Sequence, residues 1–232
     1  MPKIDGVKQA ENIARVLRNA IIEQALPAGS RLPEDSVADQ FHTSRSVVRE
    51  ALSMLSTEGL VEHRKNRGAF VAEPVWEEAR DLFDLRISLE KIVVARLPEV
   101  LTDDQLDRLR AHVATEELAR DEGHDSRSIR LGGEFHVALA EMTGSDFFLR
   151  YTRELTSRCS VMLALYSRPV SVECGVSEHF EIIDLIAAGK HAQAVLVMER
   201  HLFAVVERAM IKPRTRDKAS IAEVLAKYKN LP

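Results

Sequence analysis

The hydrophobic pattern of this 232-residue chain changes character near Glu73 and Pro74. Before that point apolar residues occur in short runs with two different periods, whereas beyond it they recur at helical spacing with few interruptions. A chain of this length suits one or two domains. The change in pattern therefore predicts a small mixed domain over residues 1–74, a larger all-helical domain over 75–212, and a tail with a helical pattern over 213–232.

Charge is distributed unevenly between these parts. The formal net charge is −4, but ten Lys or Arg balance ten Asp or Glu up to residue 74, so the excess of acid belongs to the rest of the chain. A local basic face matters more for nucleic-acid binding than the total charge. In the neutral part, five basic residues gather near one helix and one turn: Arg45, Arg49, Arg64, Lys65 and Arg67.

Composition argues against several other classes of protein. With 45% hydrophobic and 29% charged residues, the chain is that of an ordinary globular protein. Its first residues lack an apolar signal core, and no stretch approaches the ~20 apolar residues of a membrane-spanning helix. Two cysteines, Cys159 and Cys174, cannot build a disulfide framework. We therefore expect a cytoplasmic protein without a membrane partner.

The first 74 residues have the element order of a winged helix-turn-helix. Apolar spacing and turn residues predict helices over roughly 8–24, 34–41 and 44–58, and two short strands over 60–63 and 69–71. A tight connection separates the second helix from the third, and a basic, glycine-containing turn joins the strands. Ser44 is a good N-cap for the third helix.

The third predicted helix and the basic turn carry chemistry that suits DNA. Arg45 and Arg49 are four residues apart, so both project from one helix face, opposite the apolar stripe. From the N-terminal end of a recognition helix they can reach guanine edges or phosphates in a major groove. Lys65, Arg67 and Gly68 suit a wing along the DNA backbone or in the minor groove. The alternative is a solvated helix face and a basic turn without a special function.

Four stretches of this part resemble the DNA-binding domain of GntR-family transcriptional regulators: LPAGSRLPE (26–34), TSRSVVREAL (43–52), EGLV (58–61) and RGAFV (67–71). Two positions depart from the family pattern. Val47 stands where proline is common, a change that the first turn of a helix tolerates. Asp35 and Ser36 stand where many members carry a further arginine, which removes one contact to phosphate or base. The additional residues that the resemblance places on operator DNA are Arg31, Ser44 and Ser46.

The C-terminal part is predicted to form an antiparallel bundle of six helices, a fold whose core commonly holds ligands. The predicted helices are 76–99, 103–122, 127–143, 146–166, 173–188 and 191–211. His179 lies ten residues before Gly189, in the last turn between helices, and His201 lies ten residues after His191. Each is therefore ~15 Å from the turn, so an antiparallel hairpin places His179 and His201 side by side.

His136, on the third helix of this bundle, is the candidate third partner. Three converging imidazoles would make a first-row transition-metal site with open positions for a ligand. The alternative is that His136 and His201 are hydrogen-bonded interior residues and that His179 lies on the surface. Spacing alone does not decide between the two, because it does not fix the third partner.

Further stretches resemble the C-terminal ligand-binding domain of the FadR subfamily of the same family: DLFDLRISLE (81–90), EFH (134–136), EHFEII (178–183) and MERHL (198–202). The resemblance implies that His136, His179 and His201 bind a divalent transition metal such as zinc or nickel. Metal-binding members also use an aspartate one helical turn before the first histidine, and here that position is Gly132. The site is then either a three-histidine site completed by water or effector, or one whose metal is weakened or lost.

Arg86 is the candidate effector-binding residue. It shares a helical stripe with apolar residues, so its guanidinium points to the interior or the rim of the bundle, where a carboxylate is its best partner. An internal ion pair with Glu90 and a position at the rim are the alternatives. The resemblance implies a small organic or sugar acid held between arginine and metal, with Arg158 on a neighbouring helix as a second candidate.

These observations predict a mainly α protein, with a winged helix-turn-helix and a small hairpin wing before an antiparallel helical bundle. The predicted function is a bacterial transcriptional regulator, a repressor that binds a pseudo-palindromic operator as a homodimer. The alternatives are the same regulator with a metal-free or acyl-CoA-type effector site, and an all-α metalloenzyme with an accessory domain. We predict no enzymatic activity, because the sequence has no HExxH motif, no nucleophile elbow and no general base near the histidines.

Overall fold

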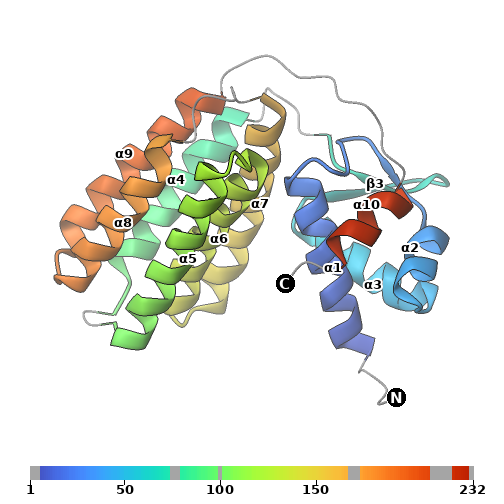
Figure 1. Cartoon of the computed structure of the whole chain (residues 1–232), viewed down its shortest axis with the longest axis horizontal. Coiled ribbons are helices and arrows are strands. Elements are labelled where there is room, and N and C mark those ends of the chain that lie inside the picture. Colours follow the sequence, from blue (N-terminus) through green and yellow to red (C-terminus); the bar gives the residue numbers. More distant parts are fainter. Residues whose placement is uncertain (1–5, 74–78, 99–100, 167–172, 210–220, 230–232) are drawn as a thin grey trace. The chain divides into compact units, whose positions relative to one another are not determined.

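The computed structural model describes residues 6–73, 79–98, 101–166, 173–209 and 221–229, and they form two compact units. The first, called the winged unit, comprises residues 1–74 together with 215–232. The second, called the helical unit, comprises residues 75–214. The predicted fold class is confirmed: the protein is mainly helical, with a winged helix-turn-helix at its N-terminal end and a helical domain after it (Figure 1).

The winged unit follows the predicted order, with one additional strand. Its elements are α1 (Gly6–Ile22), β1 (Arg31–Leu32), α2 (Glu34–Phe41), α3 (Arg45–Thr57), β2 (Val61–Arg64) and β3 (Gly68–Val71). The strands form one antiparallel sheet in the order β1-β3-β2, in which Arg31 pairs with Phe70. The sequence did not predict β1, because two residues are too short for a periodic signal. Fully buried apolar residues hold α1 and α3 together, among them Ile13, Leu17, Leu52 and Leu55.

The turn between α2 and α3 is set by local backbone chemistry. His42 ends α2 in the left-handed region, at φ 49°, and its N–H reaches back to the last turn of that helix. Ser44 caps α3, because its side chain accepts a hydrogen bond from the Val47 N–H at 3.5 Å. The left-handed residue and the cap therefore end α2 and start α3 within three residues, as in the tight turn of a helix-turn-helix.

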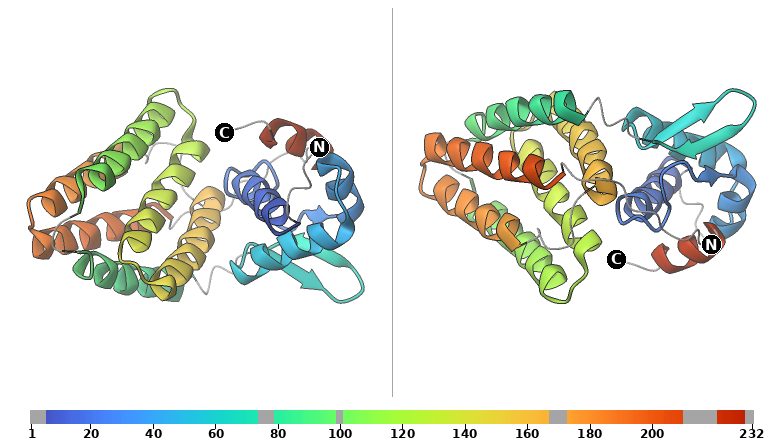
Figure 2. Two further views of the ribbon diagram at one scale, coloured as in Figure 1. Left: turned by 90° about the horizontal axis from the view of Figure 1, so that it is seen from below. Right: turned by 90° about the horizontal axis from the view of Figure 1, so that it is seen from above.

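The C-terminal helix α10 (Ile221–Tyr228) belongs to the winged unit, although it is the last element of the chain. It packs against α1 and α2, and Figure 2 shows it in red beside the blue α1 from two further directions. Leu225 and Tyr228 are buried in this contact. The Tyr228 hydroxyl donates to Glu23 Oε2 at 2.6 Å, and Lys229 Nζ donates to the Gln40 carbonyl at 2.8 Å.

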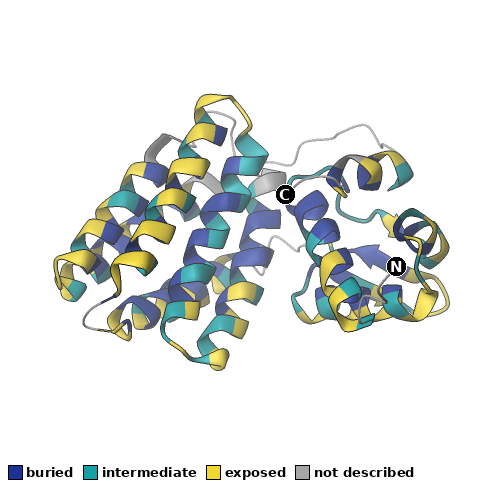
Figure 3. Cartoon of the chain, turned by 60° about the horizontal axis from the view of Figure 1, so that its bottom comes forward, coloured by how far each residue is buried: buried dark blue, intermediate teal, exposed yellow. Residues whose placement is uncertain are grey.

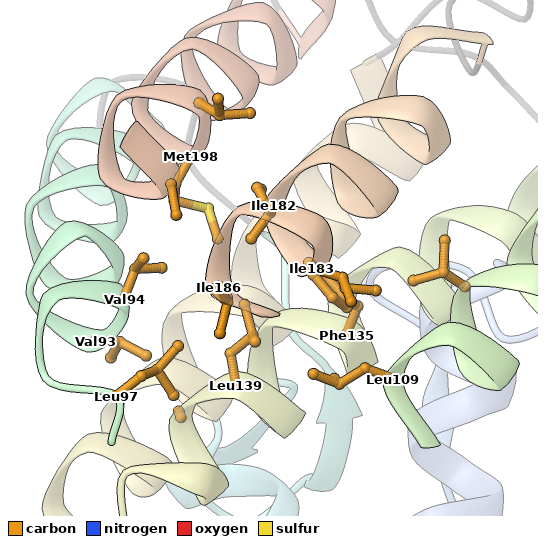
Figure 4. Packing of buried hydrophobic residues seen from close by; sticks show 14 of the residues in the cluster. Val93, Val94, Leu97, Leu109, Phe135, Leu139, Ile182, Ile183, Ile186 and Met198 are labelled. Atoms are coloured by element: carbon orange, nitrogen blue, oxygen red, sulfur yellow. The ribbon is translucent and has the colours of Figure 1, made fainter. Parts of the chain in front are cut away.

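The helical unit consists, in its described part, of six helices, each with a buried face and an exposed face (Figure 3). Apolar residues make up most of the buried faces. The order is α4 (Ala79–Ala95), α5 (Asp103–Asp121), α6 (Asp125–Met142), α7 (Asp146–Tyr166), α8 (Glu173–Ala187) and α9 (His191–Ala209). Figure 4 shows the core, where Phe135 and Leu139 of α6 meet Ile182 and Ile183 of α8. Thr102 and Gln105 form the capping box that starts α5.

In the part of the chain that the structure describes, no helix combines the length and the apolar character that crossing a membrane would require.

The burial of α10 predicts that the winged unit loses stability when that contact is weakened. Leu225→Ala removes a fully buried side chain, and such substitutions cost about 2–5 kcal/mol. We expect the free energy of unfolding of the winged unit, measured by urea titration, to fall within that range, and the amides of α10 to exchange faster with solvent. Val7→Ala is the control, because this α1 side chain is 47% exposed, and it should change little. Equal effects of the two substitutions would contradict the docking of α10.

Candidate nucleic-acid interface and metal centre

The two predicted recognition arginines lie on the first turns of α3, and both side chains are exposed. Each forms an ion pair with the first turn of α2. Arg45 Nε contacts Asp35, and Arg49 Nε donates to Glu34 Oε2 at 2.8 Å. Exposed ion pairs contribute a median of only about 0–1 kcal/mol, so both guanidinium groups can exchange these carboxylates for DNA groups at little cost.

The smaller predicted DNA contacts flank these arginines. Ser44 and Ser46 are exposed at the start of α3, and their hydroxyl oxygens lie 2.7 Å apart. Arg31 is exposed on the edge strand β1. The structure thus places the two serines beside Arg45, on the N-terminal end of the recognition helix, and Arg31 on the sheet.

The wing presents Lys65, Arg67 and Gly68 to solvent. Gly68 has φ 92°, in the left-handed region that favours glycine, and no atom lies within 4 Å of the place that a Cβ would take. Arg64 is half-buried and held against the unit, because its guanidinium lies over the Phe70 ring and its Nη2 donates to Glu73 Oε2 at 2.7 Å. The tip of the wing therefore offers two cations and a bare stretch of backbone.

Three histidines from three helices meet in the helical unit. His136 on α6, His179 on α8 and His201 on α9 are each 2% exposed. The Nε2 atoms of His179 and His201 lie 3.2 Å apart, and those of His201 and His136 lie 3.3 Å apart. His179 is buried with the other two, so it is not a surface residue. The structure brings the three predicted ligands together with the same ring nitrogen pointing inward.

A glutamate lies behind each ring of the cluster, against the Nδ1 atom. Such outer carboxylates fix the orientation and tautomer of metal-binding histidines. Sequence reasoning missed them as parts of the site, because they come from three helices and share no spacing with their partners. The pairs are His179 with Glu116 (Nδ1–Oε2 2.8 Å), His201 with Glu178 (2.9 Å) and His136 with Glu90 (2.5 Å, an ion-pair contact).

Glu90 also binds the predicted effector residue. Arg86 Nε donates to Glu90 Oε1 at 2.6 Å, one helical turn away on α4, and both side chains are almost fully buried. Burial by itself would raise the pKa of Glu90, but the charges of His136 and Arg86 outweigh it and lower the pKa to about 2. Burial lowers the pKa of His136 to about 4, against the attraction of Glu90.

A cavity of about 80 Å³ lies against the cluster. Its lining includes the three histidines, Arg86, Glu116 and Gly132. Arg158 is not part of this lining and pairs with Glu154 on its own helix at 2.8 Å. Glu134 likewise points away from the histidines and pairs with Arg130 at 2.7 Å. Of the two predicted effector contacts, the structure thus brings only Arg86 to the histidines.

Two distances in the histidine cluster match those of a transition-metal site, and all three ligand atoms lie within 4.8 Å of one another. Zn–N bonds of about 2.0–2.1 Å at tetrahedral angles separate ligand nitrogens by about 3.3 Å, and two of the Nε2 pairs lie at 3.2 and 3.3 Å. The Nδ1 atoms of His179 and His201 hydrogen-bond to carboxylate oxygens, which accept, so these two rings carry the proton on Nδ1 and leave their Nε2 lone pairs inside. The Nδ1 of His136 lies against Glu90 without a hydrogen bond. The three imidazoles fit a divalent metal with one or more open positions.

Family comparisons agree with this arrangement. A recognition helix with exposed arginines, a basic wing and a separate helical domain define a DNA-binding transcriptional regulator. Residues 9–71 match the family model described as bacterial regulatory proteins, gntR family, and residues 81–204 match the FCD domain. The chain therefore belongs to the GntR family and carries an FCD domain, as the resemblance predicts; these families and the relatives below are transcriptional regulators, not enzymes.

Several relatives match most of the chain. The HTH-type transcriptional regulator LutR of Bacillus subtilis is 29% identical over 199 residues, covering 76% of this chain and 90% of its own length. The Uxu operon regulator of Haemophilus influenzae is 26% identical and covers 82% and 77%. The HTH-type transcriptional repressor RspR of Escherichia coli is 27% identical and covers 57% and 58%.

Solved structures share the fold. A putative GntR transcriptional regulator from Rhodococcus sp. RHA1 superimposes with a TM-score of 0.73 at 24% identity, over 88% of this chain and 98% of that one. Escherichia coli McbR/YncC also gives a TM-score of 0.73, at 18% identity, over 86% and 97%. At these identities the likeness extends to the fold alone.

The buried pair of Arg86 and Glu90 predicts a large loss of stability when the arginine is removed. Arg86→Ala leaves the Glu90 carboxylate buried without its cation, and breaking such a pair costs about 3–5 kcal/mol. We expect the free energy of unfolding of the helical unit to fall by that amount in urea. Arg108→Ala is the matched control, because it breaks an exposed pair of the same spacing with Asp104 on α5. A loss as small as that of the control would show that Glu90 does not depend on Arg86.

Proposed function

We propose that this protein is a metal-assisted repressor whose operator binding responds to a small carboxylate effector. The winged unit reads the operator through Arg45 and Arg49, with the wing on the DNA backbone. Regulators of this family bind operator DNA and typically dimerise, and a homodimer presents two recognition helices to a pseudo-palindromic site. The repressor role is supported by RspR, a relative that is named a repressor.

The observation that carries the metal proposal is the convergence of three Nε2 atoms whose Nδ1 partners are carboxylates. With the proton on Nδ1, the Nε2 lone pairs of the cluster face one another in a buried space. A cation between them removes that repulsion, and imidazole nitrogen suits zinc, nickel and similar ions. When bound, the metal supplies a Lewis-acidic centre at which an anionic ligand can complete the coordination.

The cavity beside the cluster supports a small anionic effector. Its volume of about 80 Å³ suits a small organic or sugar acid. Arg86 lines the same space and, apart from the Nε–H that Glu90 accepts, a guanidinium has four more N–H donors. We infer that Arg86 and the metal hold the effector carboxylate between them, while Arg158 takes no part.

Loss of either recognition arginine should weaken operator binding. Arg45→Ala and Arg49→Ala each remove one contact to a base or phosphate, for which the expected cost is about 1–3 kcal/mol. The measurement is a gel-shift or anisotropy titration on a duplex that the wild-type protein has selected from a random pool. Arg108→Ala, which removes an exposed arginine from α5, is the control for net charge. Unchanged affinity in both α3 variants would refute the assignment of the recognition helix.

Zinc should stabilise the helical unit through the histidine cluster. A ligand at one hundred times its Kd adds about 2.7 kcal/mol to folding, so Zn²⁺ should raise the Tm of chelator-treated wild-type protein. His179→Ala and His201→Ala should abolish the rise, because each removes a ligand. His124→Ala is the control, since this histidine is exposed at the start of α6. Wild-type protein without a response to Zn²⁺, Ni²⁺ or Mn²⁺ would refute the metal proposal and leave DNA binding untouched.

A further inference from the structure

Two consecutive glycines stand inside α6, next to the histidine cluster. Glycine in a helix interior is destabilising relative to alanine, and neither Gly132 nor Gly133 has a positive φ that would require it. The reason for glycine at these two positions must therefore lie in the atoms that a side chain there would contact. A Cβ at Gly133 would lie 3.0 Å from Thr156 Cγ2 and 3.2 Å from Ser160 Oγ, so this glycine allows α6 and α7 to approach closely.

Gly132 faces a different neighbour. A Cβ there would lie 2.9 Å from Glu116 Oε1 and 3.4 Å from His179 Cε1. The Glu116 carboxylate cannot move aside freely, because it is buried and its other oxygen accepts from His179 Nδ1 at 2.8 Å. Any side chain at position 132 would therefore push on the carboxylate that orients His179.

We propose that Gly132 is a positioning residue of the histidine cluster, which acts on His179 through Glu116. The absent side chain leaves the space that the Glu116 carboxylate occupies, and Glu116 holds the Nδ1 proton of His179. The Nε2 lone pair of His179 is thereby directed at His136 and His201. The inference rests on the proposed metal site for its effect on affinity, but the close packing of Glu116 and His179 against Gly132 exists without metal.

The contact predicts that a single methyl group at position 132 weakens metal binding. Loss of an outer-shell partner typically lowers metal affinity 10–100-fold, so Gly132→Ala and Glu116→Ala should each weaken Zn²⁺ binding by about that factor. Affinity is measured by competition with a chromophoric chelator. If Gly132 acts through Glu116, the double variant should bind Zn²⁺ no more weakly than Glu116→Ala alone. If the loss of Zn²⁺ affinity in the double variant equals the product of the two single losses, the proposal is overturned.

Two control variants separate this coupling from a general disturbance of the bundle. Gly133→Ala introduces the same methyl group one residue further on, against α7, and should lower Tm while Zn²⁺ affinity stays within about threefold. Glu117→Ala removes the neighbouring, half-exposed carboxylate of α5, which pairs with Arg120, and should leave affinity unchanged. A loss of affinity in Gly133→Ala equal to that in Gly132→Ala would overturn the role of position 132.

A metal-free measurement tests the contact itself. In chelator-treated protein with ¹⁵N-labelled histidine, the ring nitrogens of His179 should report a proton on Nδ1, and this signature should shift in Gly132→Ala and in the isosteric Glu116→Gln. If both variants keep the wild-type spectrum and Zn²⁺ affinity, the proposal is wrong while the metal site stands. If wild-type protein binds no metal but the spectra shift as expected, the metal function fails and the positioning role of Gly132 stands.

Discussion

The contacts between buried carboxylates and imidazoles are the constraint on which the helical unit depends. Buried charges are stable only when they are paired and hydrogen-bonded. Glu116 and Glu178 hydrogen-bond to His179 and His201, while Glu90 accepts from Arg86 and lies against His136. These contacts join α4 to α6, α5 to α8 and α8 to α9. Five of the six helices described in this unit thus contribute to one polar cluster inside an apolar core. None of these five helices can shift at this level without separating one of these contacts.

The winged unit also contains pairs between acidic and basic side chains, but those between α2 and α3 are exposed and can separate easily. Glu34 and Asp35 on α2 hold Arg49 and Arg45 on α3, but these four groups face water, where an ion pair contributes little. The acidic pair orders the arginines in the free protein without binding them tightly. Asp35 therefore restrains Arg45 and places a carboxylate beside the N-terminal end of α3.

The sequence predicted the helices to within a few residues, because apolar residues at helical spacing leave little freedom in a bundle. It also predicted the approach of His179 and His201, since equal distances from one turn bring two residues together in an antiparallel hairpin. The sequence did not predict that the three glutamates lie behind the histidine rings, because contacts between helices depend on how the helices rotate and pack. Gly132 illustrates the difference: the sequence shows only a missing carboxylate, whereas the structure shows Glu116 in the space beside it.

The order of elements along the chain constrains how the two units can communicate. His201 lies on α9, and the chain that leaves α9 continues into α10, which packs on α1 and α2 of the winged unit. The winged unit is therefore joined to the helical unit by two covalent connections, one before α4 and one after α9. An effector changes operator affinity only if it binds two states of the protein unequally. A ligand at His201 would contact the last helix before the second of these connections.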